Sequence, residues 1–206
     1  MASTETAAEN RGALRQELLE LLARRSFRLG EFVLSSGATS SYYVDCRLTT
    51  LHARGGWLTG QLFLHALSRL SQRPEAVGGL TLGADPIVSS ISVQSALTPT
   101  PLDAFLVRKS EKKHGTGRRI EGEVRPGMRV AIVDDVCTTA ASTIQAVTAA
   151  WEAQLEVVAV LCLVEREEAG GRANLESLWR LTRQTACPFS TIFQAGEIRA
   201  WLEARA

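Results

Sequence analysis

The sequence is poor in the residues that mark a secreted or metal-binding protein. It contains four cysteines in 206 residues, none of them in a C-x-x-C pair, and no histidine lies at metal-ligand spacing from them. A disulfide framework and a zinc site are therefore disfavoured. The cysteines are Cys46, Cys137, Cys162 and Cys187. We expect reduced thiols in a cytoplasmic protein.

Long apolar runs and an excess of one charge are also missing. No apolar run approaches the roughly 20 residues that span a bilayer, and the polar stretch 1–10 does not resemble a signal peptide. Lys and Arg number 23 against 22 Asp and Glu, so the net charge of +1 gives no general attraction to nucleic acid or membranes. Hydrophobic residues make up 45% of the chain, enough for one α/β domain with a sizeable core.

The spacing of apolar residues predicts alternating strands and helices. An amphipathic helix is expected over about 11–25, followed by a hairpin of strands 27–34 and 42–46. Further along, we expect helices over 57–70, 87–97 and about 142–152, and strands over 77–82, 104–107, 129–133 and 155–164. This alternation is typical of a parallel sheet with crossover helices. Because such sheets bind ligands at the carboxyl ends of their strands, residues that follow a strand are the functional candidates.

The most informative segment is 129–143, where the predicted strand ends in Asp134 and Asp135. A loop of small and hydroxylated residues follows, and then a helix. Backbone N–H groups at a helix N-terminus favour an anion, and hydroxyls lie beside them on Thr138, Thr139, Ser142 and Thr143. We interpret the loop as a cradle for a phosphate monoester, with the acids accepting hydrogen bonds from ribose hydroxyls or holding hydrated Mg²⁺ indirectly. The alternative is structural: Asp135 starts a turn, and Thr139 or Ser142 caps the helix.

Positive charge is concentrated in the segment 108–121. It carries six Lys or Arg against two Glu, a net charge of +4 in a chain whose total is +1. Gly115 and Gly117 make it pliable, and it is longer than an ordinary connection. We interpret it as a lid that closes over a polyanion and stabilises leaving pyrophosphate. On composition alone, a solvated loop or a nucleic-acid-binding arm remains the alternative.

Residues 134–142, with the pattern acidic-acidic-x-x-Thr-Thr-small-small-Ser, resemble the phosphoribosyl pyrophosphate (PRPP) signature of type I phosphoribosyltransferases. The resemblance implies that Asp134 and Asp135 hold the ribose hydroxyls and that the loop holds the 5-phosphate. The implied loop residues are Val136, Cys137, Thr138, Thr139, Ala140, Ala141 and Ser142. The family usually has glycine at the position of Ala140 or Ala141, and alanine narrows the backbone conformations open to the loop.

The lid segment resembles one branch of that family. Residues 108–115 contain Arg-Lys-x-x-Lys-x-His-Gly, which looks like the catalytic-loop pattern of orotate phosphoribosyltransferases. The residues thereby implied in pyrophosphate contact are Arg108, Lys109, Lys112 and His114. The catalytic residues implied are Lys109, Lys112, His114, Asp134 and Asp135. The resemblance also implies a homodimer in which this loop serves the neighbouring subunit's site.

Two earlier segments are similar to the same family. Residues 32–37 together with 42–45 resemble its hood over the base, although many members have lysine at the position of Ser35. Residues 79–86 resemble its pyrophosphate-binding loop. Taken alone, the first segment is equally a hairpin with packed aromatic residues, and the second a strand followed by a helix cap.

Arg166 follows the predicted strand 155–164. An arginine at a strand's carboxyl end can bind a carboxylate at two points. In the family, the matching arginine binds orotate, and the residue matching Thr138 approaches the base as well. The alternative is a surface ion pair of Arg166 with Glu167 or Glu168.

The resemblance over about 27–172 implies a Rossmann-like α/β fold, a parallel sheet flanked by helices as in type I phosphoribosyltransferases, with a small N-terminal hood. We expect one domain, 1–206, with helix and hood over about 1–50 and the α/β core with its lid over 51–206. The implied reaction makes orotidine 5′-monophosphate from orotate and PRPP, with Mg²⁺ held by PRPP and water and no covalent intermediate. Two alternatives stay open: a phosphoribosyltransferase for another base, and a regulatory protein that keeps the PRPP fold and binds nucleic acid.

Overall fold

The structure is a computed structural model that describes residues 2–33, 39–109, 119–167, 170–182 and 187–205. Several positions discussed above lie outside these residues, namely Ser35, Lys112, His114, Gly115, Gly117 and Glu168. Within the described part of the chain, no helix combines the length and the apolar character needed to cross a membrane.

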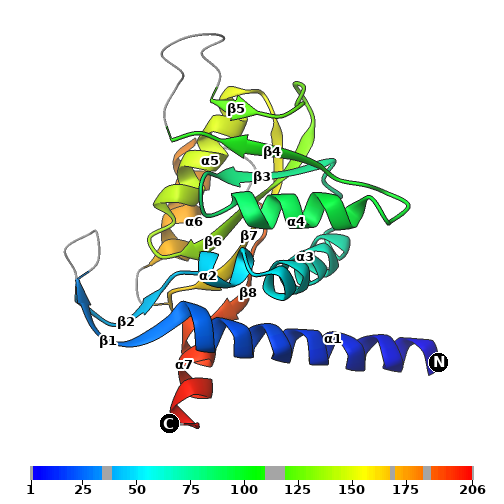
Figure 1. Ribbon diagram of the computed structural model, residues 1–206. Helices are drawn as coiled ribbons and strands as arrows, with labels where there is room; N and C mark the ends of the chain where they lie inside the picture. Colours follow the sequence, from blue (N-terminus) through cyan, green and yellow to red (C-terminus); the bar gives the residue numbers. More distant parts are fainter. Residues whose placement is uncertain (1, 34–38, 110–118, 168–169, 183–186, 206) are drawn as a thin grey trace.

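A six-stranded sheet forms the centre of the molecule, in the order β5-β4-β3-β6-β7-β8 (Figure 1). Its strands are β3 Ala76–Leu80, β4 Asp103–Val107, β5 Ile120–Glu121, β6 Arg129–Cys137, β7 Glu156–Glu165 and β8 Phe189–Gln194. All neighbours pair in parallel except β4 and β5, which are antiparallel. The α/β fold with a mostly parallel sheet is therefore confirmed.

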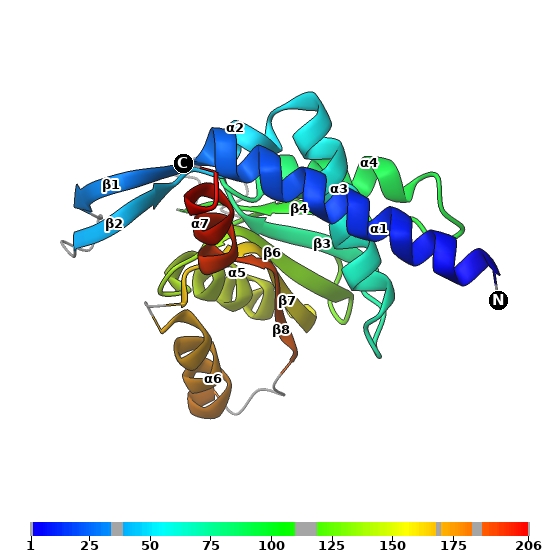
Figure 2. The same ribbon diagram turned by 90° about the horizontal axis from the view of Figure 1, so that it is seen from below.

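Helices cover both faces of this sheet (Figures 1 and 2). They are α1 Ala2–Leu21, α2 Arg47–Thr50, α3 Ala53–Ser68, α4 Asp85–Ser95, α5 Ala141–Glu152, α6 Gly171–Thr182 and α7 Ala195–Glu203, with a π-helical turn at Leu22–Ser26. Alternate residues of β7 face opposite sides: Leu161 and Leu163 join the core beneath α1, α3 and α4, whereas Val160 and Cys162 join the core beneath α5 and α6. Burial on both faces explains why β7 is apolar between Glu156 and Glu165, its two end residues.

A separate two-stranded hairpin, β1 Phe27–Val33 and β2 Thr39–Val44, extends from the body next to α1 (Figure 2). The rings of Phe27 and Tyr42 stack with centroids 4.8 Å apart, and those of Phe32 and Tyr43 lie 5.6 Å apart. The predicted hairpin with packed aromatic residues is confirmed, and it lies at the carboxyl ends of the central strands.

Several predicted boundaries differ from the structure, among them those of the first helix, which spans Ala2–Leu21, and of the second hairpin strand, which spans Thr39–Val44. Two further differences bear on the site. Strand β6 was expected to end at Val133, but it continues to Cys137, so Asp134 and Asp135 lie inside a strand and start no turn. Pairing with β7, where Asp134 lies opposite Cys162, overrides the low strand propensity of aspartate. The lid segment is also shorter than 108–121, because residues 120–121 form β5 against β4.

Candidate active site

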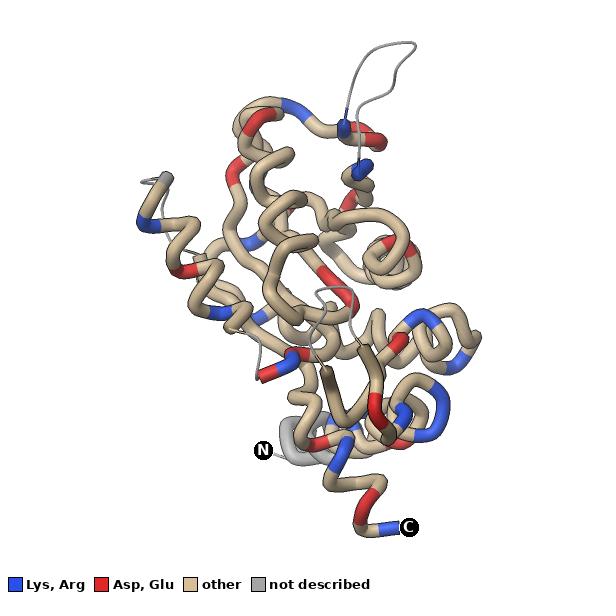
Figure 3. The backbone as a smooth tube through the Cα atoms, turned by 90° about the vertical axis from the view of Figure 1, so that its left-hand side faces the viewer, with Lys and Arg blue, Asp and Glu red and all other residues tan. Residues whose placement is uncertain are grey.

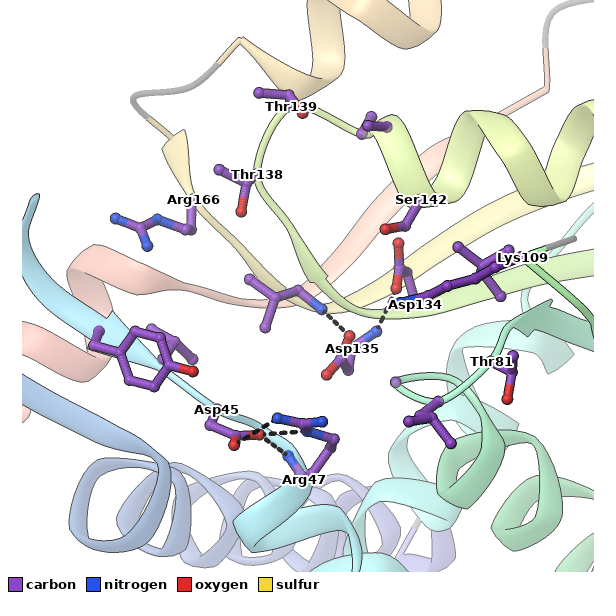
Figure 4. Close-up of a pocket in the computed structure, with 18 of the residues that line it drawn as sticks. Asp45, Arg47, Thr81, Lys109, Asp134, Asp135, Thr138, Thr139, Ser142 and Arg166 are labelled. Atoms are coloured by element: carbon purple, nitrogen blue, oxygen red, sulfur yellow. Dashed lines mark hydrogen bonds and ion pairs between the residues drawn. The ribbon is translucent and has the colours of Figure 1, made fainter. Parts of the chain in front are cut away.

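A cavity of about 540 Å³ opens at the carboxyl ends of β3 and β6, between the hairpin and the start of α5 (Figure 4). It brings together most of the predicted site residues. These are Lys109, Asp134, Asp135, Val136, Thr138, Thr139, Ala140, Ala141, Ser142 and Arg166. Residues far apart in the sequence thus meet where a parallel sheet is expected to bind its ligand.

The two neighbouring acids have different surroundings. Asp134 is 4% exposed and accepts hydrogen bonds from the Thr143 hydroxyl at 2.7 Å and the Asp135 N–H at 3.0 Å. Burial, with the charge of Asp135 adding to it, raises the pKa of Asp134 to about 7. Asp135 is less buried, and burial raises its pKa as well. The sequence pattern places the Thr143 hydroxyl beside the phosphate, and this prediction is wrong. The hydroxyl donates to Asp134 instead, because Thr143 lies on the buried face of α5.

The loop that follows β6 ends in an unusual backbone conformation. Ala140 is the N-cap of α5, with φ 61° and ψ 15°, in the left-handed region that favours glycine. Its methyl side chain cannot cap the helix, and the alternative in which Thr139 or Ser142 caps it is wrong. The hydroxyl-bearing residues Thr138, Thr139 and Ser142 line the cavity instead. An uncapped helix N-terminus facing a cavity is a site for an anion.

Arg166 is 4% exposed and lies beneath the hairpin. Its Nη2 donates to the Ser40 hydroxyl at 2.6 Å, and its guanidinium lies 4.2 Å from the centre of the Tyr42 ring. The backbone N–H of Arg166 donates to the carbonyl of Cys137, whose own side chain belongs to the core and does not line the cavity. Figure 4 shows Arg166 beside Thr138, so both residues expected near a base face one region.

An ion pair on the cavity floor was not predicted. Arg47 donates from Nε to Asp45 Oδ1 at 2.8 Å and from Nη2 to Oδ2 at 2.9 Å. These hydrogen bonds hold the pKa of the Asp45 carboxyl below its usual value. The pattern Asp-x-Arg after a strand could have indicated the pair, because the chain turns into α2 between the two residues.

The loop after β3 lies directly against Asp135 in the cavity. A Cβ built on Gly83 would lie 2.3 Å from Asp135 Oδ1, so only glycine lets the backbone approach this carboxylate so closely. Thr81 and Leu82 line the cavity next to it. The segment 79–86 is therefore part of the site, and α4 begins immediately after it.

Two neighbouring residues at the start of the lid segment have different surroundings. Lys109 lines the cavity, whereas Arg108 forms an ion pair with Glu121 at 3.1 Å and does not. Basic residues flank the undescribed range 110–118, while over the rest of the described backbone positive and negative side chains are mixed (Figure 3). Of the described residues of the basic segment 108–121, Lys109 is the one that lines the cavity.

No protein-family model matches the chain. The orotate phosphoribosyltransferase of Thermosynechococcus vestitus is 42% identical over 195 residues, which cover 94% of this chain and 97% of that protein. That of Aquifex aeolicus is 40% identical over 187 residues, which cover 89% and 97%. A crystal structure of the Mycobacterium tuberculosis orotate phosphoribosyltransferase in complex with PRPP matches with a TM-score of 0.71 and 34% identity, over 90% of this chain and 99% of that one.

Proposed function

The chain belongs to the orotate phosphoribosyltransferase family, and we propose that it performs the family's reaction in the cavity between the hairpin and α5. Enzymes of this family are pentosyltransferases of pyrimidine biosynthesis, which transfer ribose 5-phosphate from PRPP to orotate and release pyrophosphate. One observation carries the proposal: an uncapped helix N-terminus and the buried Arg166 face the same cavity, which Asp135 also lines.

The 5-phosphate of PRPP would lie at the start of α5. Backbone N–H groups of the first helical turn donate to its oxygens, and the hydroxyls of Thr138, Thr139 and Ser142 add donors at the same place. Asp135 then accepts hydrogen bonds from the ribose hydroxyls, because its carboxylate faces the cavity. Asp134, already bonded to Thr143, fixes the strand end from which Asp135 projects.

Orotate would lie between the ribose and the hairpin. Its carboxylate pairs with Arg166, whose orientation is held by Ser40 and Tyr42, and Thr138 approaches the ring. The base nitrogen forms a bond to the anomeric carbon and gives up its proton, while the bond from that carbon to the pyrophosphate oxygen breaks. The leaving pyrophosphate takes the bonding electrons and can accept the proton. The carbon passes through an oxocarbenium-like state, and the charge of Asp135 lies on the side of the developing positive charge.

The leaving pyrophosphate would lie against the loop 81–83, within reach of Lys109 and Arg47. Arg108, Lys112 and His114 complete this set when the lid closes, which also excludes water that would hydrolyse PRPP. Cations placed where negative charge develops lower the barrier to departure.

Mg²⁺ fits this site best when it is held by PRPP oxygens and water. The carboxylates that line the cavity in the described residues are Asp45, Asp134 and Asp135. The first is bound by Arg47 and the second by Thr143, which leaves Asp135 to accept a hydrogen bond from a metal-bound water. The ion would neutralise part of the pyrophosphate charge.

A homodimer is part of the proposal. The adjoining helices α2, α3 and α4 expose large apolar side chains on Leu48, Leu51, Trp57 and Val93, with exposed fractions of 45, 73, 39 and 72%. Leu82, which lines the cavity just ahead of α4, is 64% exposed as well. A second copy on this surface would bury it and would bring its lid next to the cavity. We place the enzyme in the cytoplasm, in keeping with its free thiols.

The decisive experiment follows orotate by its ultraviolet absorbance, with PRPP and Mg²⁺ together and with each left out. Loss of absorbance only in the complete mixture is expected. Hypoxanthine and uracil serve as parallel bases, and comparable turnover of either would overturn orotate as the substrate. PRPP binding without turnover of any base would instead favour the regulatory alternative. A salt-dependent shift in the electrophoretic mobility of RNA or DNA on adding the protein would favour it as well.

A further inference from the structure

Helix α6 begins directly behind the loop that joins β6 to α5. A Cβ built on Gly171 would lie 2.6 Å from the carbonyl oxygen of Thr138 and 2.8 Å from the Cys137 sulfur. One turn later, Asn174 donates from Nδ2 to the carbonyl oxygen of Thr139 at 3.0 Å. Helix α6 therefore touches the loop backbone on the side away from the cavity, and only glycine at position 171 allows this approach.

The start of α6 is itself fixed to the sheet. Arg172 Nη2 lies 2.9 Å from Oε2 of Glu165, a residue that is 6% exposed at the end of β7. The same guanidinium lies 4.7 Å from the centre of the Phe189 ring on β8. Leu175 and Trp179 of α6 are buried in the core, at 1% and 6% exposure. Contacts from α6 can therefore resist a movement of the loop.

Such resistance is needed because of Ala140. A non-glycine residue in the left-handed region is strained and persists only where its surroundings hold it. Ala140 is 2% exposed and has no cap hydrogen bond of its own. Its backbone N lies 3.4 Å from the position a Gly171 Cβ would take, so α6 packs on the strained residue as well as on the two before it.

We propose that Gly171 and Asn174 are positioning residues that hold Ala140 in its left-handed conformation and so keep the loop amides aligned for the PRPP 5-phosphate. The inference rests on the proposed function of this loop. With glycine at position 140, the same conformation would need no support. Asn174 acts through the loop backbone and does not touch substrate.

A double-mutant cycle between positions 140 and 174 tests this. Asn174→Ala removes one hydrogen bond and should raise the KM for PRPP about three- to tenfold, with kcat and the KM for orotate within about twofold. In the Ala140→Gly background, the same substitution should change the KM for PRPP by less than about twofold. Glu176→Ala, an exposed change on the same helix, is the matched control and should leave all three parameters unchanged.

Gly171→Ala is a second, stronger perturbation, because its Cβ must displace the Thr138 carbonyl. It should raise the KM for PRPP more than Asn174→Ala does, and circular dichroism checks that it folds. Equal effects of Asn174→Ala in both backgrounds would show that Asn174 does not hold Ala140 in its conformation, while leaving the proposed function intact. A folded, unchanged chain that neither binds nor turns over PRPP would overturn the proposed function and this inference together.

Discussion

Arg47 holds Asp45 through two hydrogen bonds, Nε to Oδ1 and Nη2 to Oδ2, on the floor of the cavity (Figure 4). The pair joins the end of the hairpin to the first turn of α2. It also fixes the direction of the guanidinium relative to Asp135, which lies above it in the same cavity.

We predict that Asp45→Asn raises the KM for PRPP about three- to tenfold, because the released Arg47 no longer has one orientation toward the pyrophosphate. Steady-state kinetics with varied PRPP at saturating orotate measure this. Glu17→Gln is the matched control: it breaks an equally short ion pair, with Arg54 at 2.6 Å, away from the cavity. A comparable rise in KM for both variants would show that Asp45 acts only on the fold.

Substituting Arg166 should separate the two substrates. Arg166→Lys keeps the charge but loses the two-point contact, so the KM for orotate should rise about 10- to 100-fold. PRPP binding, measured by calorimetry without orotate, should stay within about threefold. Parallel losses for both substrates would mean that Arg166 supports the hairpin and the loop end but does not recognise the base.

The sheet and the loop were predictable from sequence because their signals are local. The continuous apolar run along β7 and the run from Asp134 to Ser142 are visible in consecutive residues. Side-chain direction was not predictable in the same way. Thr143 belongs to the same hydroxyl-rich run, yet its hydroxyl points to Asp134 because α5 has already begun at Ala141.

Contacts between distant segments were harder to foresee. Asn174 donates a hydrogen bond to the Thr139 carbonyl, and Arg166 is buried under Tyr42. Neither contact leaves a pattern in neighbouring residues, because each depends on how distant elements pack. Ala140 shows the same limit. Its alanine suggested a narrowed backbone, whereas the structure places it in the left-handed conformation that glycine would adopt.

The stability of the protein should depend on Asp134. Its pKa is raised from an ordinary 3.8 to about 7 in the folded state, so the folded protein retains a proton that the unfolded chain has released. The free energy of unfolding should therefore fall by about 1–4 kcal/mol as the pH rises from 3.8 to about 7. Asp134→Asn, which cannot ionise, should flatten that decrease and be more stable than the unchanged chain above this range.

Urea unfolding at a series of pH values between about 4 and 8 measures both chains. The free energy of unfolding of the variant should still fall somewhat with rising pH, because burial raises the pKa of Asp135 too. Identical slopes for the two chains would show that Asp134 is not the group responsible. If the variant had a smaller free energy of unfolding at every pH, the Asp134 carboxylate would stabilise the fold, contrary to the prediction.

Mixing two inactive variants tests whether the lid serves the neighbouring subunit. Lys112→Ala should lower kcat far more than it weakens PRPP binding, because the lysine stabilises charge that develops only as pyrophosphate leaves. Arg166→Ala should disable the cavity itself. If the lid crosses to the partner, a mixed dimer has one site in which the cavity and the lid are both intact. Random reassortment should then restore about one quarter of the unchanged activity. A lid that closes over its own cavity leaves every site in the mixture defective, so no recovery, in a sample shown by ultracentrifugation to have exchanged subunits, would refute the shared lid.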